Sequence, residues 1–326
     1  DVRACNLSYL QTDWYISQMK RPYYNSPGLP ISWEEKDYMP GKNEVVWVEN
    51  RLNAPLEVKK AFQFLHSDDP RTKRDGEGYL PSDQLYVFAP DSQKIMFKKA
   101  RRFTRSEMMV MDMLSTNEWK RPIYFAVTIG NDYHLGLDPY LELTGLAYRI
   151  TPERSENGRH RVNTEVMYDN MLHKFKYGNM NVPGIYIDEN TMRMCRTHRM
   201  MFMELAEALY NEGKHDKCLE VLDFAEEMLP GYNISYDYTS ATMAAYYYQL
   251  GEIEKANAIM TKVADNSVEY MAWGASLPKE QRASSQSTLQ QQLAILGYVL
   301  QNFERYQQKE LFNLYYDLYV QYASVR

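Results

Sequence analysis

The sequence predicts an α/β domain followed by an all-α domain built from helical repeats. In residues 1–150, short β-branched or aromatic runs alternate with segments whose apolar residues lie three and four positions apart. From Met192 onward the strand-like runs become few and the helical spacing continues. Residues 151–190, which contain Pro152, Gly158 and Gly178, are predicted to connect the α/β domain to the helical domain, residues 191–326.

In the α/β domain, strands are predicted at residues 2–7, 45–48, 85–88, 94–98 and 123–127. Helices are predicted from Thr12 or Asp13 to Lys20, from Pro55 to Leu65, and after a cap at Ser106. The alternation of strands and helices favours an α/β layer, and it leaves the order of the strands open.

The second domain contains a spacing that is typical of tetratricopeptide repeats. Large and small apolar residues, a turn glycine and a final proline follow one another at Phe202, Leu205, Ala206, Gly213, Cys218, Leu222, Ala225 and Pro230. A second copy runs through Met243, Ala244, Tyr247, Gly251, Ala256, Met260 and Val263. The two turn glycines are 38 positions apart, against roughly 34 for this repeat, which indicates an insertion at residues 231–234.

A third helix pair is predicted at residues 289–300 and 311–322, without a turn glycine between the helices. We interpret it as the capping pair of the stack, because terminal repeats have a more polar outer face. A plain bundle of helical hairpins is the alternative to the repeat interpretation.

The composition excludes several classes of protein. A total of 37 Lys and Arg against 43 Asp and Glu gives a formal net charge of −6, which argues against a general nucleic-acid binder. Three cysteines cannot form a disulfide scaffold. Cys195 and His198 form a single pair where structural zinc needs four ligands, and no Gly-rich phosphate loop is present. The sequence therefore predicts no metal, no cofactor and no catalytic residue.

Two places in the first domain are candidate ligand sites because of their side-chain chemistry. Asp13 and Trp14 pair a carboxylate with an indole, which suits stacking and hydrogen bonding to a sugar; the alternative is a capped helix with a buried aromatic residue. Arg121 precedes Pro122 at the start of a strand, where a guanidinium fork suits a phosphate or carboxylate; the alternative is a structural ion pair.

A third candidate site follows the most strand-like segment of the chain. Asp132, Tyr133 and His134 come shortly after the strand at 123–127. Loops at the carboxyl ends of strands are where α/β sheets bind ligands. An ordinary surface loop is the alternative interpretation.

The helical domain is rich in tyrosine, and the whole chain has 28. Stacked helix pairs form a concave surface that binds extended peptides. Three consecutive helical residues cannot share one face, so we expect part of the tyrosine set to line a peptide groove: Tyr246, Tyr247, Tyr248, Tyr315 and Tyr319. The alternative is that these rings pack the helices together.

Several longer motifs of the first domain are more specific than its secondary structure. They are DVRACNLS at residues 1–8, TDWYI at 12–16, LPIS at 29–32, TNEWKRPIYFAVT at 116–128, GLD at 136–138 and LTGLAYR at 143–149. Together they resemble the soluble carboxy-terminal part of a family of large multi-pass membrane proteins that is common in Bacteroidetes. Members of this family look like protein O-mannosyltransferases that use lipid-linked sugars.

The resemblance implies a role without catalysis for this chain. The catalytic carboxylate of such enzymes lies in a loop near amino-terminal membrane helices, and no residue here matches that motif. We expect the chain, which begins at Asp1 without a Met, to be part of a longer protein that is attached to the membrane through preceding transmembrane helices. The resemblance places it on the periplasmic face of the inner membrane, as a region that recognises an acceptor polypeptide or a protein partner. A scaffold module of the cell envelope, unrelated to sugar transfer, is the alternative.

Overall fold

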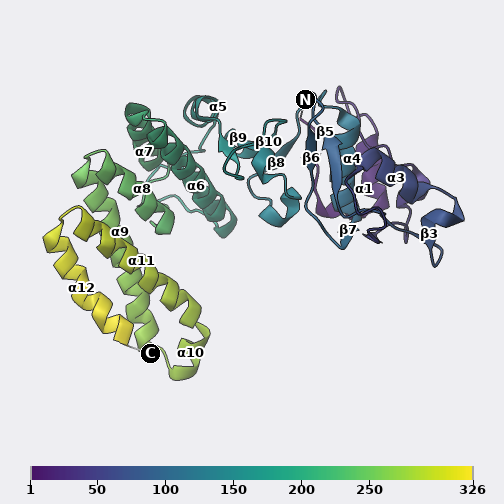
Figure 1. The fold of residues 1–326 in the computed structure, drawn as a ribbon. Helices are drawn as coiled ribbons and strands as arrows, with labels where there is room; N and C mark the ends of the chain where they lie inside the picture. Colours follow the sequence, from purple (N-terminus) through teal and green to yellow (C-terminus); the bar gives the residue numbers. More distant parts are fainter. Residues whose placement is uncertain (1, 325–326) are drawn as a thin grey trace. The chain divides into compact units, whose positions relative to one another are not determined.

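The computed structural model describes residues 2–324 and divides the chain into two compact units (Figure 1). Unit 1 comprises Asp1–Leu143 and Ala147–Arg161. It contains every described β-strand except Val162, the second residue of the last strand. Unit 2 comprises Thr144–Leu146 and Val162–Arg326, and its carboxy-terminal region is all helical. The coarse prediction of a β-containing region followed by a helical region is therefore confirmed.

The strands of unit 1 form small separate sheets. One sheet has the order β2–β5–β6, with β2 and β5 parallel, and the others are antiparallel where their pairing is defined: β1–β7, β3–β4, and β11–β9–β10–β8. The strands are β1 (Val45–Trp47), β2 (Leu56–Glu57), β3 (Lys73–Arg74), β4 (Glu77–Gly78), β5 (Leu85–Phe88), β6 (Lys94–Met96), β7 (Arg102–Thr104), β8 (Tyr124–Ala126), β9 (Leu141–Leu143), β10 (Ala147–Ile150) and β11 (Arg161–Val162). Because these strands are so short, they do not build the single layer that the alternation suggests.

Four α-helices accompany these sheets: α1 (Asp13–Lys20), α2 (Glu35–Tyr38), α3 (Val58–His66) and α4 (Arg105–Asn117). The predicted strand at 2–7 is wrong, because the described part of this segment has no ladder partner and the Asn6 amide instead donates to the Tyr15 hydroxyl at 2.8 Å. The predicted helix from Pro55 begins only at Val58, since β2 pairs with β5 before it. The cap is Thr104 instead of Ser106, because Thr104 and Glu107 form a capping box.

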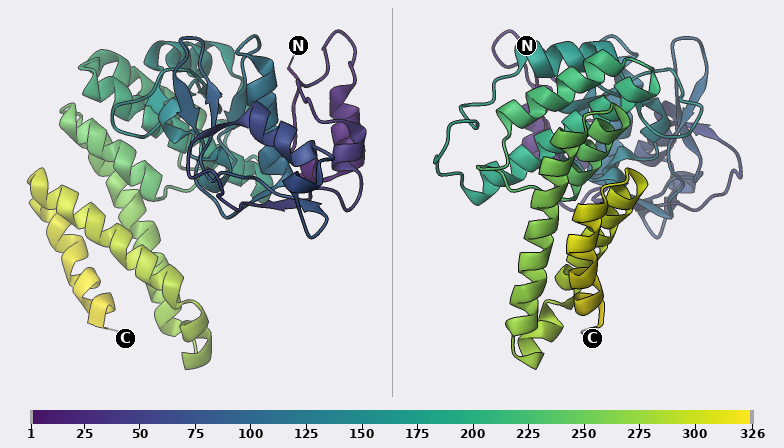
Figure 2. Two further views of the ribbon diagram at one scale, coloured as in Figure 1. Left: turned by 45° about the vertical axis from the view of Figure 1, so that its right-hand side comes forward. Right: turned by 90° about the vertical axis from the view of Figure 1, so that its left-hand side faces the viewer.

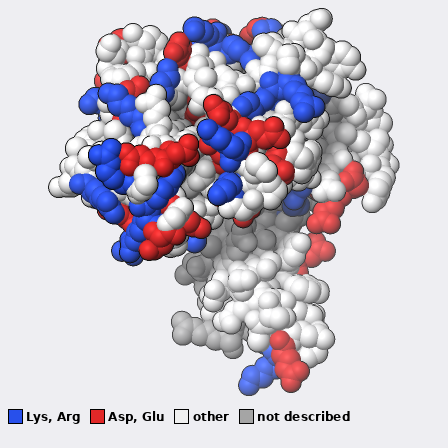
Figure 3. Space-filling model, turned by 90° about the vertical axis from the view of Figure 1, so that its right-hand side faces the viewer, with Lys and Arg blue, Asp and Glu red and all other residues white. Residues whose placement is uncertain are grey.

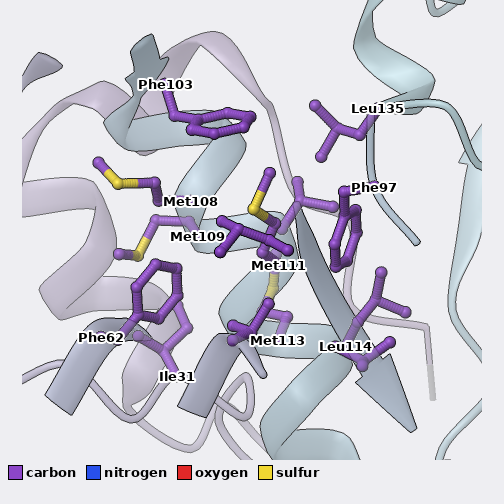
Figure 4. Packing of buried hydrophobic residues seen from close by; sticks show 14 of the residues in the cluster. Ile31, Phe62, Phe97, Phe103, Met108, Met109, Met111, Met113, Leu114 and Leu135 are labelled. Carbon is purple, nitrogen blue, oxygen red and sulfur yellow. The ribbon is translucent and has the colours of Figure 1, made fainter. Parts of the chain in front are cut away.

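Helix α4 forms the centre of the unit 1 core. Its methionines, Met108, Met109, Met111 and Met113, lie among Phe62, Phe97 and Phe103 from other segments (Figure 4). The sequence predicts apolar residues on one face of this helix, at Met109, Met113 and Leu114, but α4 is buried on nearly all sides. A helix that is packed on all sides needs side chains that fill irregular gaps, and the flexible thioether of methionine does this.

A buried arginine fixes the start of α4. Arg105 is 1% exposed, and its guanidinium donates to the backbone carbonyls of Gln11, Met39 and Lys42. The Gln11 carbonyl ends a 3₁₀ turn, Ser8–Gln11, and the Met39 and Lys42 carbonyls lie in the loop after α2. Arg105 therefore ties the amino-terminal segments to the core helix.

Unit 2 consists of successive helices that pack against their neighbours (Figure 2). They are α5 (Thr164–Asp169), α6 (Glu189–Asn211), α7 (His215–Met228), α8 (Tyr238–Gln249), α9 (Ile253–Ser276), α10 (Lys279–Ser284), α11 (Gln286–Arg305) and α12 (Lys309–Ser324). Helix α6 contacts α7 and α8, α8 contacts α9, and α11 contacts both α9 and α12. The segment 151–190, predicted as a connection, contains β11, α5 and a π-helical turn at Asn170–Lys174.

Three turns between helices share one backbone conformation. Gly213, Gly251 and Gln307 all have left-handed φ angles, of 74°, 86° and 59°. In each turn this residue donates its amide to the carbonyl three positions earlier, and the next residue donates to the carbonyl five positions before itself. Such paired bonds close the exposed end of a helix. The third turn adopts this geometry with glutamine, although glycine adopts it at lower cost.

A second buried arginine organises unit 2. Arg199 of α6 is 1% exposed, and it donates to the carbonyls of Leu229, Ile234 and Ser235 at 2.8–3.0 Å. These residues belong to the loop between α7 and α8, where the sequence indicates the insertion. The inserted residues are therefore held against α6 by charge-assisted hydrogen bonds.

Replacement of Arg199 by methionine should lower the free energy of unfolding of unit 2 by about 2–4 kcal/mol, because three buried carbonyls lose their donor. Urea unfolding followed by circular dichroism measures this change. The control is Arg196→Met, an exposed position on the same helix, which should change stability by less than about 0.5 kcal/mol. Equal stability of the two variants would contradict the role given to the Arg199 hydrogen bonds.

Candidate functional site

A cavity of about 340 Å³ in unit 1 is lined by three cationic side chains and an indole. The cations are Lys120, Arg121 and Arg149, and the indole belongs to Trp119. The remaining lining residues are neutral: Pro90, Leu114, Asn117, Pro122, Ile123, Ile150, Thr151 and Pro152. We call this cavity the cationic pocket.

The chain reverses direction at the carboxyl end of α4 to build one wall of the pocket. Glu118 and Trp119 both have left-handed φ angles, of 47° and 60°, which is an uncommon conformation for residues other than glycine. Asn117 holds the reversal, since its side chain accepts from the Arg121 amide and donates to the Arg121 carbonyl. The Trp119 indole donates to the Phe88 carbonyl at 2.8 Å.

Segments far apart in the sequence fix Arg121 in place. Its guanidinium donates to the Gly28 carbonyl at 3.0 Å. Ser32 follows Gly28 by four positions, and its amide and hydroxyl both donate to the buried Asp112 carboxylate at 2.6 Å. Burial raises the pKa of Asp112, and the hydrogen bonds from Ser32 and Thr116 partly offset this. Asp112 therefore joins the two motifs beside the pocket, because it accepts from Ser32 of the motif at 29–32 and from Thr116 of the motif at 116–128.

The charges in the pocket are only partly balanced. Glu118 lies outside the lining and bonds Lys59 at 2.8 Å and Lys120 at 3.0 Å, which lowers the pKa of Glu118 to about 2 and keeps it anionic. Within residues 2–324, no carboxylate forms an ion pair with Arg121 or Arg149. On the face shown in Figure 3, by contrast, basic and acidic side chains are intermixed.

The other ligand-site predictions in unit 1 fall outside the pocket. Asp13 begins α1, and Trp14 is exposed with its ring 6.0 Å from that of Tyr9, whereas the neighbouring Tyr15 is buried. The proposed sugar platform therefore has an accessible indole, and its binding of sugar stays a prediction.

The structure does not gather Asp132, Tyr133 and His134 into one site. They lie in a 3₁₀ turn, Asn131–His134. His134 is buried against Phe125, with its Nδ1 atom 2.9 Å from the Asp138 carboxylate. Tyr133 is exposed, and the Asp132 carbonyl accepts from Lys98 at 2.9 Å. Of the predicted ligand residues, Arg121 is the one that lines the cationic pocket.

Unit 2 has a polar groove of about 550 Å³. Its lining comes from α6, from the start of α8, and from facing parts of α9 and α11; it includes Arg196, Tyr238, Asn266, Glu269, Tyr270, Gln291 and Gln292. Tyr238 and Tyr270 are half-exposed. The Asn266 side-chain amide nitrogen donates to the Tyr236 carbonyl at 3.0 Å. We call this surface the polar groove.

The tyrosines predicted to line a groove mostly pack the helices instead. Tyr247, Tyr248 and Tyr315 are buried, and their hydroxyls donate to Asp223, Asn257 and Asp265 at 2.5–2.9 Å. Tyr246 and Tyr319 are half-buried, and neither lines the polar groove. The repeat spacing marks buried packing positions, so it could not find Tyr238 and Tyr270.

The remaining sequence candidates show no ligand-binding arrangement. Cys195 is buried, and the His198 Nδ1 atom donates to the Met194 carbonyl at 2.8 Å. Among the described residues, no three His, Cys, Asp or Glu side chains gather in a way that could hold a metal ion. A search of the same residues for helices long and apolar enough to cross a membrane found none.

The β-containing unit with its cationic pocket corresponds to a known family. The family model of TMEM260-associated domain 2 matches residues 1–100 and 88–167, which together are just over half of the chain and include every residue that lines the pocket. The chain therefore belongs to the TMEM260-associated domain 2 family. No curated protein and no solved structure matches the chain.

Replacement of Ser32 by alanine should lower the free energy of unfolding of unit 1 by about 1–2 kcal/mol, because the buried Asp112 carboxylate loses a hydroxyl donor. Denaturant unfolding followed by near-ultraviolet circular dichroism reports the change. Ser8→Ala, at an exposed serine of the same unit, is the matched control. A loss of the same size in both variants would refute the role given to the Ser32–Asp112 bond.

Proposed function

We propose that this chain is the recognition region of a membrane-embedded glycosyltransferase and holds an acceptor polypeptide in the polar groove of unit 2. Membership of the TMEM260-associated domain 2 family supports the link, because TMEM260 is an O-mannosyltransferase-like membrane protein. The motifs that resemble protein O-mannosyltransferases point the same way. In this proposal the chain lies on the periplasmic face of the inner membrane, and the membrane-embedded part of the protein carries out the transfer.

Helical repeats of the tetratricopeptide class form the proposed recognition scaffold. The shared turn conformation at Gly213, Gly251 and Gln307 supports three related helix pairs. The small and large apolar residues of the first two copies are buried, as interlocking repeats require: Phe202, Leu205, Ala206, Cys218, Leu222, Ala225, Met243, Ala244, Tyr247, Ala256, Met260 and Val263.

The polar groove is the observation that carries the proposal. Amide and phenol groups of Asn266, Gln291 and Tyr270 line it. These groups both donate and accept hydrogen bonds, so they match the alternating amides and carbonyls of an extended backbone. Half-exposed tyrosines provide apolar contact area with few rotatable bonds to immobilise.

Fluorescence anisotropy with labelled, unstructured Ser- and Thr-rich peptides tests the proposal. The wild-type chain should bind them, and Tyr270→Ala should weaken binding about tenfold because a contact ring of the groove is lost. Tyr316→Ala removes a similarly exposed tyrosine outside the groove (47% exposed, against 50% for Tyr270), and it should leave binding unchanged.

Two results would count against this function. Absence of peptide binding, or equal weakening by both variants, would remove the groove as the recognition surface. A stable complex with an envelope protein, without affinity for these peptides, would instead favour an envelope scaffold unrelated to sugar transfer.

A further inference from the structure

We propose that the cationic pocket of unit 1 binds the phosphate group of a phosphorylated ligand. This site lies in a different unit from the polar groove and needs no polypeptide. The inference therefore goes beyond acceptor recognition and can fail or succeed independently of it.

The charge of the pocket lining favours an anionic ligand. Among the described residues no carboxylate lies within ion-pair distance of Arg121 or Arg149, although Glu142 pairs with Arg149 in register on β9. Lys120 shares Glu118 with Lys59. A phosphate monoester carries close to two negative charges at neutral pH, which suits a lining with three cationic side chains and no carboxylate. Arginine also offers the planar fork that binds phosphate oxygens in pairs.

The backbone holds these two arginines in position before any ligand arrives. The Ile150 amide donates to the Ile123 carbonyl at 2.9 Å, and Arg149 pairs in register with Tyr124 on β8. The end of β10 therefore lies beside the segment that follows Arg121. One guanidinium nitrogen of Arg121 is anchored on Gly28, so the side chain loses little freedom when its other nitrogens bind an anion.

The pocket is larger than a phosphate group alone. At about 30 Å³ for each water, a cavity of about 340 Å³ holds roughly ten waters. The space beyond the phosphate is lined by apolar side chains and by Trp119, whose indole nitrogen is already bonded to Phe88. The Trp119 ring is thus left for apolar contact, which suits the organic group that carries the phosphate.

Isothermal titration calorimetry of the full 326-residue chain with glucose 1-phosphate tests the site. Arg149→Gln should weaken binding at least tenfold, since hydrogen bonds to a charged group are lost. Arg154→Gln makes the same change of charge at an exposed arginine of unit 1 outside the pocket, and it should bind like the wild type. Arg149 and Arg154 are both exposed, so we expect both variants to unfold at the same denaturant midpoint as the wild type. This measurement verifies that they fold.

Sedimentation with phosphatidylcholine vesicles that contain phosphatidic acid distinguishes a lipid phosphate from a soluble one. Arg149-dependent binding to either probe supports the site, and the tighter probe identifies the source of the phosphate. No binding of either probe, equal weakening by Arg149→Gln and Arg154→Gln, or succinate binding as tight as glucose 1-phosphate would overturn the proposal. Tyr270→Ala should leave phosphate binding unchanged, which separates this test from that of the polar groove.

Discussion

Both units depend on a buried guanidinium that binds backbone carbonyls of loops and turns. Arg105 does this in unit 1 and Arg199 in unit 2, and each donates to three backbone oxygens. A loop packed against a core cannot leave its carbonyls without donors. One arginine on a well-packed helix supplies several donors at once, so long non-repetitive segments can be held against helices without extra strands. This arrangement explains how sheets of such short strands belong to a compact unit.

Hydrogen bonds between side chains and backbone atoms also position the residues around the cationic pocket. Asp112 fixes the segment near Ser32, Asn117 fixes the chain reversal, and Gly28 anchors Arg121. The motifs that carry the family resemblance therefore have a structural role as well as a place in the pocket wall. Several of their polar side chains bond to backbone atoms, and three cationic residues line the cavity. The polar groove of unit 2 instead carries amide and phenol groups beside charges of both signs, so the two surfaces differ in chemistry.

Sequence patterns predicted the elements that depend on interactions between residues close in the sequence. Apolar spacing predicted α3 and the buried faces of the helix pairs, and the β-branched run at 45–48 predicted β1. Strand pairing, by contrast, depends on partners distant in sequence, which is why the run at residues 2–7 failed as a strand. Arg121 was predicted from its chemistry. Lys120 and Arg149 were present in the quoted motifs, but only the pairing of β8 with β10 brings those motifs together. Tyr247 and Tyr315 were misplaced because a tyrosine that satisfies its hydroxyl on a carboxylate packs like a core residue.

The glutamine at the last interhelical turn has a consequence for how the stack opens. A left-handed backbone costs a residue with a side chain roughly 1 kcal/mol more than glycine, and Gln307 bears that cost where Gly213 and Gly251 do not. Helix α12 is also the last described helix, and only one of its residues, Tyr315, is buried. Local unfolding should therefore start at the carboxy-terminal hairpin, and its amides should exchange with deuterated solvent sooner than those of α8 and α9. The stack would then melt from one end.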